Sequence, residues 1–179
     1  NLKKYTNPYE FIHTNIPQHS FSVAKYKPIS RAFFKIVEIY NAFDLLSYNR
    51  PIKTYHLAEG PGGFIEATAY VRNNRFDKYY GMTLIEKNNN VPGWKKSENF
   101  LNKHHNVFIE RGKTKNGDLY EAENFKDCFQ KHRNDFDIIT GDGGFDFSRD
   151  FNNQEEQAFR LILTQTMYAI AMQKYGGTF

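Results

Sequence analysis

The chain contains the stretch His56-Leu57-Ala58-Glu59-Gly60-Pro61-Gly62-Gly63-Phe64-Ile65-Glu66-Ala67, which indicates a strand, a tight turn and the start of a helix. Residues 53–58 include β-formers, and apolar residues return at helical spacing over 64–71. Glycine and proline between them let the backbone turn sharply and approach a ligand. Backbone N–H groups of such a turn can face a nucleotide-sized ligand. An ordinary tight loop is the alternative, but three glycines within four residues make it the weaker interpretation.

A second glycine-rich turn follows a strand predicted at residues 137–140. The sequence there is Asp137-Ile138-Ile139-Thr140-Gly141-Asp142-Gly143-Gly144. An acid at the end of a buried strand is costly unless it contacts a ligand or backbone donors. Asp142 is therefore a second candidate site residue. A turn aspartate that accepts its neighbours' N–H groups is the alternative.

The remaining pattern predicts an α/β protein with a Rossmann-like, mostly parallel sheet and helices on both faces. Strands are expected at 78–84 and 107–110, and helices at 31–46, with Ser30 as N-cap, and at 121–132. Residues 85–99 are expected to form a loop. Both glycine-rich turns then fall at carboxyl ends of strands, where such sheets bind ligands.

The two ends of the chain are predicted to differ from this regular core. Residues 1–29 contain three prolines and no sustained period, so they indicate an irregular N-terminal arm before a domain at 30–179. A long helix is expected to start at an Asn153–Glu156 capping box, to reach Lys174 and to end at Gly176. Thr178 would begin another strand, so the sheet is expected to be truncated before its last strands.

Composition restricts the class of protein. The 179 residues, 40% of them hydrophobic, suffice for one domain. The sequence shows neither a bilayer-length apolar run nor a secretory leader. A lone cysteine, Cys128, argues against a disulfide framework and suits a reducing compartment, so a cytoplasmic location is expected. The cysteine and six scattered histidines make no zinc pattern, and no metal is predicted.

The positive charge is concentrated in the first third of the chain. Residues 1–55 carry a balance of +5 and the remainder −1, with aromatic residues interleaved among the lysines of the arm. This pattern favours a polyanionic partner such as nucleic acid, with a solvated basic face as the alternative. Arg31 and Lys35 lie four residues apart on the predicted helix and could contact a phosphate or supply a catalytic ammonium. Pairing of Lys35 with Glu38 is the simpler alternative.

The first turn matches neither common phosphate-binding template. Counting from Gly60, the third glycine of a G-x-G-x-x-G motif would fall on Ile65, and Gly62-Gly63-Phe64 lacks the lysine of a P-loop. An acid, Glu59, directly before Gly-Pro-Gly-Gly favours a cofactor that is not a pyrophosphate.

These motifs together resemble the FtsJ-like ribose 2′-O-methyltransferases, in the cap-modifying branch of eukaryotes and large DNA viruses. The resemblance spans about residues 30–179 and is carried by the order of three motifs and by the C-terminal Gly176-Gly177-Thr178-Phe179. The motifs are Glu59-Gly60-Pro61-Gly62-Gly63-Phe64, Gly117-Asp118-Leu119 and the turn around Asp142.

The resemblance implies S-adenosylmethionine as cofactor and a ribose 2′-hydroxyl of capped RNA as methyl acceptor. By the same resemblance, Lys35 matches the family's first catalytic lysine and Asp142 its catalytic aspartate. Cofactor contacts would come from Glu59, Gly60, Pro61, Gly62, Gly63 and Phe64, from Asp118, which would face the adenine, and from Asp142. Arg31 and Lys35 would contact RNA. For a viral member, the location would be the host cytoplasm or the virion.

The family completes its catalytic set with a lysine after Gly-Gly-Thr-Phe and a further glutamate, which these 179 residues do not contain. The isolated chain is therefore expected to be inactive. Two alternatives stay open: a catalytically silent module that binds cofactor or RNA, and a methyltransferase with a protein or small-molecule acceptor.

Overall fold

The computed structural model describes residues 6–85, 93–144 and 154–179. Five parallel strands form one sheet in the order β3-β2-β1-β4-β5. The strands are β1 (Lys53–Leu57), β2 (Lys78–Met82), β3 (Val107–Glu110), β4 (Phe136–Gly141) and β5 (Gln173–Thr178). The α/β, Rossmann-like fold predicted from the sequence is confirmed, and every strand pairing described is parallel.

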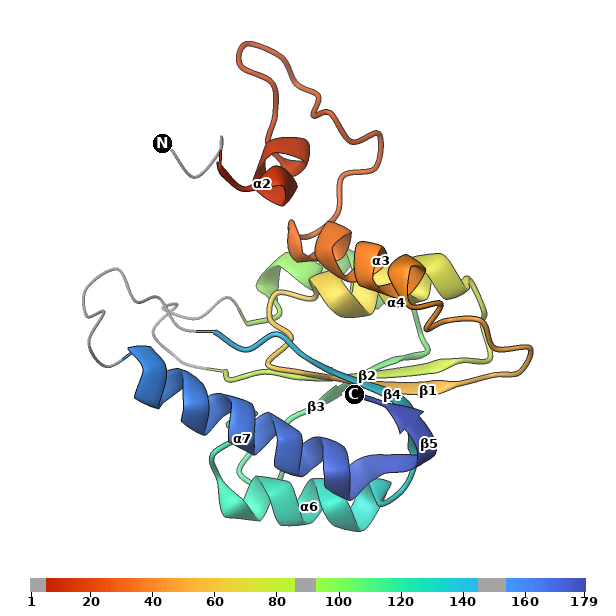
Figure 1. Cartoon of the computed structure of the whole chain (residues 1–179), viewed down its shortest axis with the longest axis vertical. Coiled ribbons are helices and arrows are strands. Elements are labelled where there is room, and N and C mark those ends of the chain that lie inside the picture. Colours follow the sequence, from red (N-terminus) through yellow and green to blue (C-terminus); the bar gives the residue numbers. More distant parts are fainter. Residues whose placement is uncertain (1–5, 86–92, 145–153) are drawn as a thin grey trace.

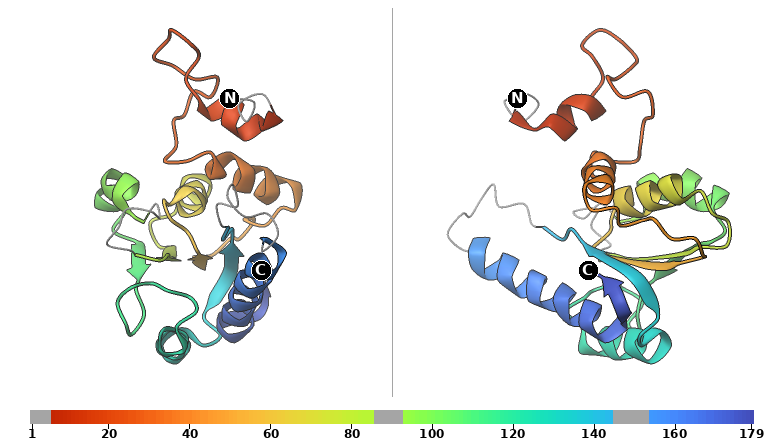
Figure 2. Two further views of the ribbon diagram at one scale, coloured as in Figure 1. Left: turned by 90° about the vertical axis from the view of Figure 1, so that its left-hand side faces the viewer. Right: turned by 45° about the vertical axis from the view of Figure 1, so that its right-hand side comes forward.

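Helices cover both faces of the sheet (Figures 1 and 2). Helices α3 (Ala32–Ala42), α4 (Gly63–Arg72) and α5 (Glu98–Lys103) lie on one face, and α6 (Ala122–His132) and α7 (Gln154–Met172) on the other. Because side chains alternate along a strand, Tyr55 and Leu57 of β1 enter the core under α6 and α7. On the opposite face, Phe33 and Tyr40 of α3 pack with Phe64 of α4.

Helix α7 and strand β5 divide the C-terminal residues differently from the prediction. The helix ends at Met172, and Lys174 and Gly176 lie in a six-residue strand that pairs with β4. The Lys174 ammonium lies 3.3 Å from both carboxylate oxygens of Asp137, which is almost fully buried. This ion pair and the β4 pairing outweigh the helical pattern of the sequence. The expected Asn153–Glu156 capping box lies outside the described residues.

The N-terminal arm was predicted to be irregular, but part of it forms helix α2 (Pro8–His13). The Asn7 side chain accepts the N–H groups of Tyr9 and Glu10, and Pro8 occupies the first helical position, where it needs no N–H partner. The helix lies over α3 (Figure 1), where the Tyr9 hydroxyl donates to Glu38 over 2.7 Å. Asn-Pro was thus a helix-start signal.

The loop predicted over residues 85–99 is interrupted by helical structure. The short helix η1 covers Lys95–Ser97 and leads directly into α5, whose Phe100 packs with α4 and β2. Residues 86–92, which precede η1, lie outside the described ranges. None of the described helices combines the length and apolar character that a membrane span requires.

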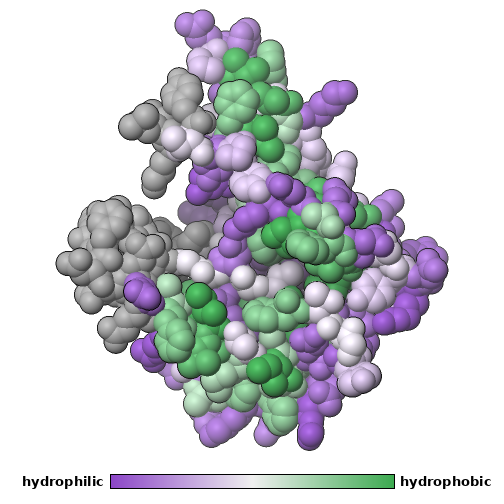
Figure 3. Space-filling view, viewed as in Figure 1, coloured by the Kyte–Doolittle hydropathy of each residue, from purple (hydrophilic) through white to green (hydrophobic). Residues whose placement is uncertain are grey.

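The solvent-facing side of α7 is unusually apolar. Figure 3 shows apolar side chains gathered on this side of the molecule. The exposed apolar side chains of the helix are Phe159, Ile162, Leu163, Met167 and Ile170.

Candidate active site

The first glycine-rich turn connects β1 to α4 by a backbone that packs closely on its neighbours. Gly62 has a φ of 113°, which only glycine adopts without strain. A Cβ on Gly63 would lie 2.2 Å from the Ser30 hydroxyl oxygen, and one on Gly60 would lie 2.9 Å from Oγ1 of Thr83. The glycines therefore permit close approach, as predicted for this turn.

Glu59 supports the turn from beneath. Its Oε1 accepts the N–H groups of Phe64 and Ile65, each over 2.9 Å, so the carboxyl group caps the first turn of α4. Burial raises the pKa of Glu59 to about 8, against the opposing effect of these two hydrogen bonds. This capping role could not be predicted from the residue pattern, because it depends on how the turn places Glu59 against the first N–H groups of the helix.

A cavity of about 260 Å³ lies between the loops that follow the first four strands. It brings together three residues predicted at the site, Gly60, Asp118 and Asp142, which come from three different loops. A smaller cavity of about 40 Å³ adjoins it at Gly60 and Asp142. The smaller cavity is lined by Ser30, Ala32, Ala58, Glu59, Gly60, Pro61, Gly63, Phe64 and Asp142. Of the predicted turn residues, only Gly62 lines neither cavity.

Lys35 and Asp142 meet beside this cavity, although 107 residues separate them in the sequence. The Lys35 ammonium donates to Oδ2 of Asp142, and its nitrogen lies 5.4 Å from the centre of the Phe64 ring. Both side chains remain partly exposed. The alternative of a Lys35–Glu38 pair is excluded, since Lys35 binds Asp142 and Glu38 accepts a hydrogen bond from Tyr9.

Asp142 is not held as an ordinary turn aspartate. Among the described residues, its carboxylate accepts no hydrogen bond from a backbone N–H, and its partner is Lys35. The turn is instead fixed by Gln165 of α7, whose Oε1 accepts the Gly143 N–H over 3.1 Å. Gln165 is almost fully buried, and its Nε2 donates to the Leu161 carbonyl. Nothing in the local sequence pattern distinguishes Gln165 from the other positions of the helix, so this role could not be predicted.

The loop that carries Asp118 depends on a second residue that sequence reasoning missed. Asn124 of α6 is fully buried, and its amide nitrogen donates to the Asp118 carbonyl and to Asn116. Its Oδ1 accepts the Thr114 N–H over 2.8 Å. The Asp118 carboxylate accepts the Tyr120 N–H through Oδ1. Asn124 lies in an unremarkable amphipathic pattern, so no local signal distinguished it.

Helix α3 positions the two predicted cations differently. Its first residues include Arg31 at the N-cap position, and the Ser30 side chain makes no capping hydrogen bond, contrary to prediction. Arg31 donates to Glu10 of α2 over 2.7 Å, whereas Lys35 reaches Asp142. The Ser30 hydroxyl is buried beside the small cavity and has no hydrogen-bond partner among the described residues. RNA contact by Arg31 stays a prediction.

Known proteins are similar to this chain in sequence and in architecture. A family model described as FtsJ-like methyltransferase matches residues 28–179. A relative from Autographa californica nuclear polyhedrosis virus, described as a cap-specific mRNA (nucleoside-2′-O-)-methyltransferase, is 30% identical over 148 residues. That alignment covers 82% of this chain and 53% of the relative, so the chain spans about half the length of that protein.

A crystal structure described as a ribosomal RNA methyltransferase from Plasmodium falciparum is similar in fold. It superposes with a TM-score of 0.54 at 19% identity, over 83% of this chain and 74% of that one.

Proposed function

Since this chain belongs to the FtsJ-like methyltransferase family, we propose that it binds S-adenosylmethionine and takes part in methylating a ribose 2′-hydroxyl of capped RNA. The observation that carries the proposal is the Lys35–Asp142 pair beside the cavity that also contains Gly60 and Asp118. The description of the viral relative as a cap-specific enzyme supports capped RNA as the substrate. The balance of +5 over residues 1–55 supports a polyanionic substrate.

The residues around the cavity fit the proposed cofactor. A Cβ on Gly143 would lie 2.7 Å from Leu161 Cδ2 and one on Gly60 would lie 2.9 Å from Thr83 Oγ1, so glycine lets both turns pack closely on the residues that line the cavity. Asp118 would hold the adenosine end, with one carboxylate oxygen left after its hydrogen bond to Tyr120. Asp142 would attract the cationic amino group. The unpartnered Ser30 hydroxyl provides a further polar group beside the turn. When bound, the cofactor supplies an electrophilic methyl group.

Lys35 and Asp142 would act on the acceptor. A sugar hydroxyl is a poor nucleophile, so the site must hold its oxygen in line and stabilise the negative charge that develops on it. The Lys35 ammonium has three N–H donors, of which Asp142 takes one, and no other described residue accepts from it, so the remaining donors could bind the hydroxyl oxygen. Asp142 and the Phe64 ring hold the ammonium at this place. A fixed charge of this kind needs no reorganisation during the reaction.

Methyl transfer to capped RNA by the full-length protein tests the proposal. Lys35→Ala should lower turnover by about 100-fold or more, the usual effect of removing a group that stabilises developing charge. Cofactor affinity, measured by calorimetry, should change little, because Lys35 does not line the 260 Å³ cavity. Lys126→Ala, an exposed lysine on α6, is the matched control and should leave turnover unchanged.

Two results would overturn the proposal. Undiminished ribose methylation by Lys35→Ala would remove the residue from the mechanism. Intact cofactor binding by the wild-type protein without ribose methylation would favour a catalytically silent module or a different acceptor.

A further inference from the structure

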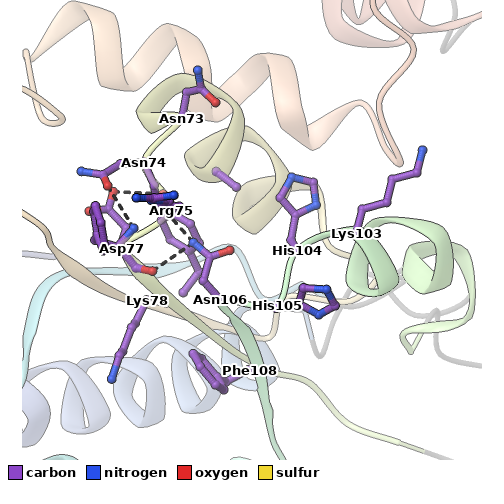
Figure 4. A pocket seen from close by; sticks show the side chains of 13 residues that line it. Asn73, Asn74, Arg75, Asp77, Lys78, Lys103, His104, His105, Asn106 and Phe108 are labelled. Atoms are coloured by element: carbon purple, nitrogen blue, oxygen red, sulfur yellow. Dashed lines mark hydrogen bonds between the residues drawn. The ribbon is translucent and has the colours of Figure 1, made fainter.

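A larger cavity lies at the other edge of the sheet, where the strands begin. It measures about 710 Å³ and is formed mainly by two segments, residues 73–78 before and at the start of β2 and residues 103–106 before β3. Figure 4 shows Lys103, His104 and His105 on one side of this pocket, and Asn74 and Arg75 on the other. We refer to it as the amino-edge pocket. It shares no lining residue with the cavities around Asp142.

The framework of the amino-edge pocket is fixed by buried polar contacts. The Asn106 amide donates to the Asp77 carbonyl over 3.0 Å and so joins the two segments (Figure 4). Asp77 is fully buried, and its carboxylate pairs with Arg72 over 2.7 Å and accepts the Tyr79 hydroxyl. The pocket therefore has a preformed shape, as binding sites usually do.

The lining of the amino-edge pocket carries unpaired positive charge. Within the described part of the chain, the charged groups of Arg75, Lys78 and Lys103 form no ion pair or hydrogen bond. The one acid of the lining, Asp77, is already balanced by Arg72. The Nδ1 atom of His104 contacts the Phe100 carbonyl, and its Nε2 atom has no hydrogen-bond partner among the residues that the structure describes. A concave surface with this charge attracts an anion.

Two aromatic rings add a second kind of contact. Phe76 is 63% exposed and Phe108 is 39% exposed, although both are large apolar side chains that line the pocket. The Arg75 guanidinium lies 4.7 Å from the centre of the Phe76 ring, and Phe108 is supported from behind by stacking on Tyr80. Exposed rings beside cationic side chains are the combination that binds single-stranded nucleic acid, by base stacking and phosphate contact.

We propose that the amino-edge pocket is a second RNA-binding site, which binds one nucleotide of the substrate. It lies where the strands begin, whereas the Lys35–Asp142 pair lies beside the loops that follow the strands. Phosphates of this nucleotide and of its neighbour would contact Arg75, Lys78 and Lys103, whose side chains point in different directions (Figure 4), and the base would stack on Phe108. This inference rests on the proposed function, since that function makes RNA the substrate. A five-residue strand spans roughly 17 Å, so an RNA that reaches both edges of the sheet is several nucleotides long.

The test compares two double variants that remove equal charge. Arg75→Gln with Lys103→Gln removes two charges from the amino-edge pocket. Arg133→Gln with Lys126→Gln is the matched control, because Arg133 also lies over a phenylalanine, Phe129, and Lys126 is also an exposed lysine. Affinities for capped RNAs of about 4 and about 20 nucleotides are measured by fluorescence anisotropy at several salt concentrations.

The pocket variant should bind the longer RNA about 10-fold more weakly at low salt, with a salt slope reduced by about 1.4, as expected for two lost phosphate contacts. The shorter RNA and the control variant should each change less than about 2-fold. Phe108→Ala should weaken binding of the longer RNA about 5-fold or more, through lost stacking.

Equal losses for pocket and control variants, or equal losses for both RNA lengths, would overturn the inference. An acidic protein partner would be indicated instead if a polyglutamate peptide bound as tightly as RNA and if the pocket variant weakened the binding of the peptide and of the RNA equally. Methylation of the shorter RNA is measured with the full-length protein and its variants. Its absence in the wild-type protein contradicts the proposed function, whereas an unchanged affinity for the longer RNA contradicts only the second site.

Discussion

Glu59 shows how one buried carboxyl group makes stability depend on pH. Burial raises its pKa to about 8 in the folded protein, from 4.5 in a solvated chain. The unfolded state therefore releases this proton more readily, and the contribution of Glu59 to stability is lost as pH rises from about 4.5 to 8. Glu59→Gln keeps an oxygen that accepts the Phe64 and Ile65 N–H groups but cannot ionise.

We therefore expect the stability of Glu59→Gln, relative to wild type, to increase between pH 5 and 8. The difference should grow by at most about 1.4 kcal/mol per pH unit, the limit for one proton. Urea unfolding at several pH values measures it. Burial also lowers the pKa of His56 to about 3, so His56 makes the stability of each protein depend on pH. This effect is the same in both proteins and cancels when their stabilities are compared. Parallel stability curves would contradict the assigned pKa.

Residue patterns predicted individual site residues, but not the contacts that those residues make. Asp142 was singled out from its glycine-rich turn and Lys35 from its helix, and the structure places them in contact. That contact could not be derived from residue patterns, since it depends on how α3 lies over the end of β4. Glu59 was expected at the cofactor and lines the smaller cavity, and its Oε1 has the further role of capping α4.

Helix α7 holds the second glycine-rich turn through a single buried side chain. Gln165 accepts the Gly143 N–H. Glycine leaves the necessary space at both positions beside Gln165, because a Cβ on Gly141 would lie 2.5 Å from the Gln165 amide oxygen and one on Gly143 would lie 3.1 Å from its amide nitrogen. Gln165→Ala would leave that N–H unpaired and a void beneath the turn. We expect the free energy of unfolding to fall by about 1–3 kcal/mol and cofactor affinity to fall with it.

Urea unfolding and calorimetry measure these two effects. Thr166→Ala is the matched control, because the Thr166 hydroxyl also bonds within α7, to the Ile162 carbonyl, but at the exposed side. A loss of stability without a change in cofactor affinity would mean that the turn keeps its shape without Gln165.

At the element scale, strands and helices were predictable where local pattern and tertiary packing agree. Strand β3 begins at Val107 and ends at Glu110 as predicted. The pattern failed at Lys174, where the buried Asp137 carboxylate and an adjacent strand draw the chain out of the helix. The pattern also failed to predict helix α5, because its six residues are too few to show a clear helical period.

For the whole molecule, the alternation of strands and helices was enough to predict a parallel sheet, but not its strand order. The order β3-β2-β1-β4-β5 places β1 and β4 side by side, with the two glycine-rich turns at the same edge. Both turns were expected at the carboxyl ends of strands, and they form one site because β1 and β4 are neighbours in the sheet. His56 joins these strands by bridging Thr54 and Thr140.

Glu66 of α4 is one of the residues that join the arm to the sheet domain. Its carboxylate accepts the Tyr26 hydroxyl and the Ile29 N–H, each over 2.8 Å, and is largely buried. Glu66→Ala removes both contacts and leaves the Ile29 N–H without its partner, so we expect the arm to detach locally while the sheet stays folded. Limited proteolysis should then cut within residues 14–29 several-fold faster.

Glu123→Ala is the matched control for this experiment, because Glu123 forms only a surface pair with Lys126. If the arm carries part of the RNA surface, as the charge of residues 1–55 suggests, the Glu66 variant should also bind RNA more weakly at low salt. Faster proteolysis with unchanged RNA affinity would separate the two roles. The RNA would then be held by the domain alone, and the contact of the arm with α3 would depend on pairs such as Glu10 with Arg31.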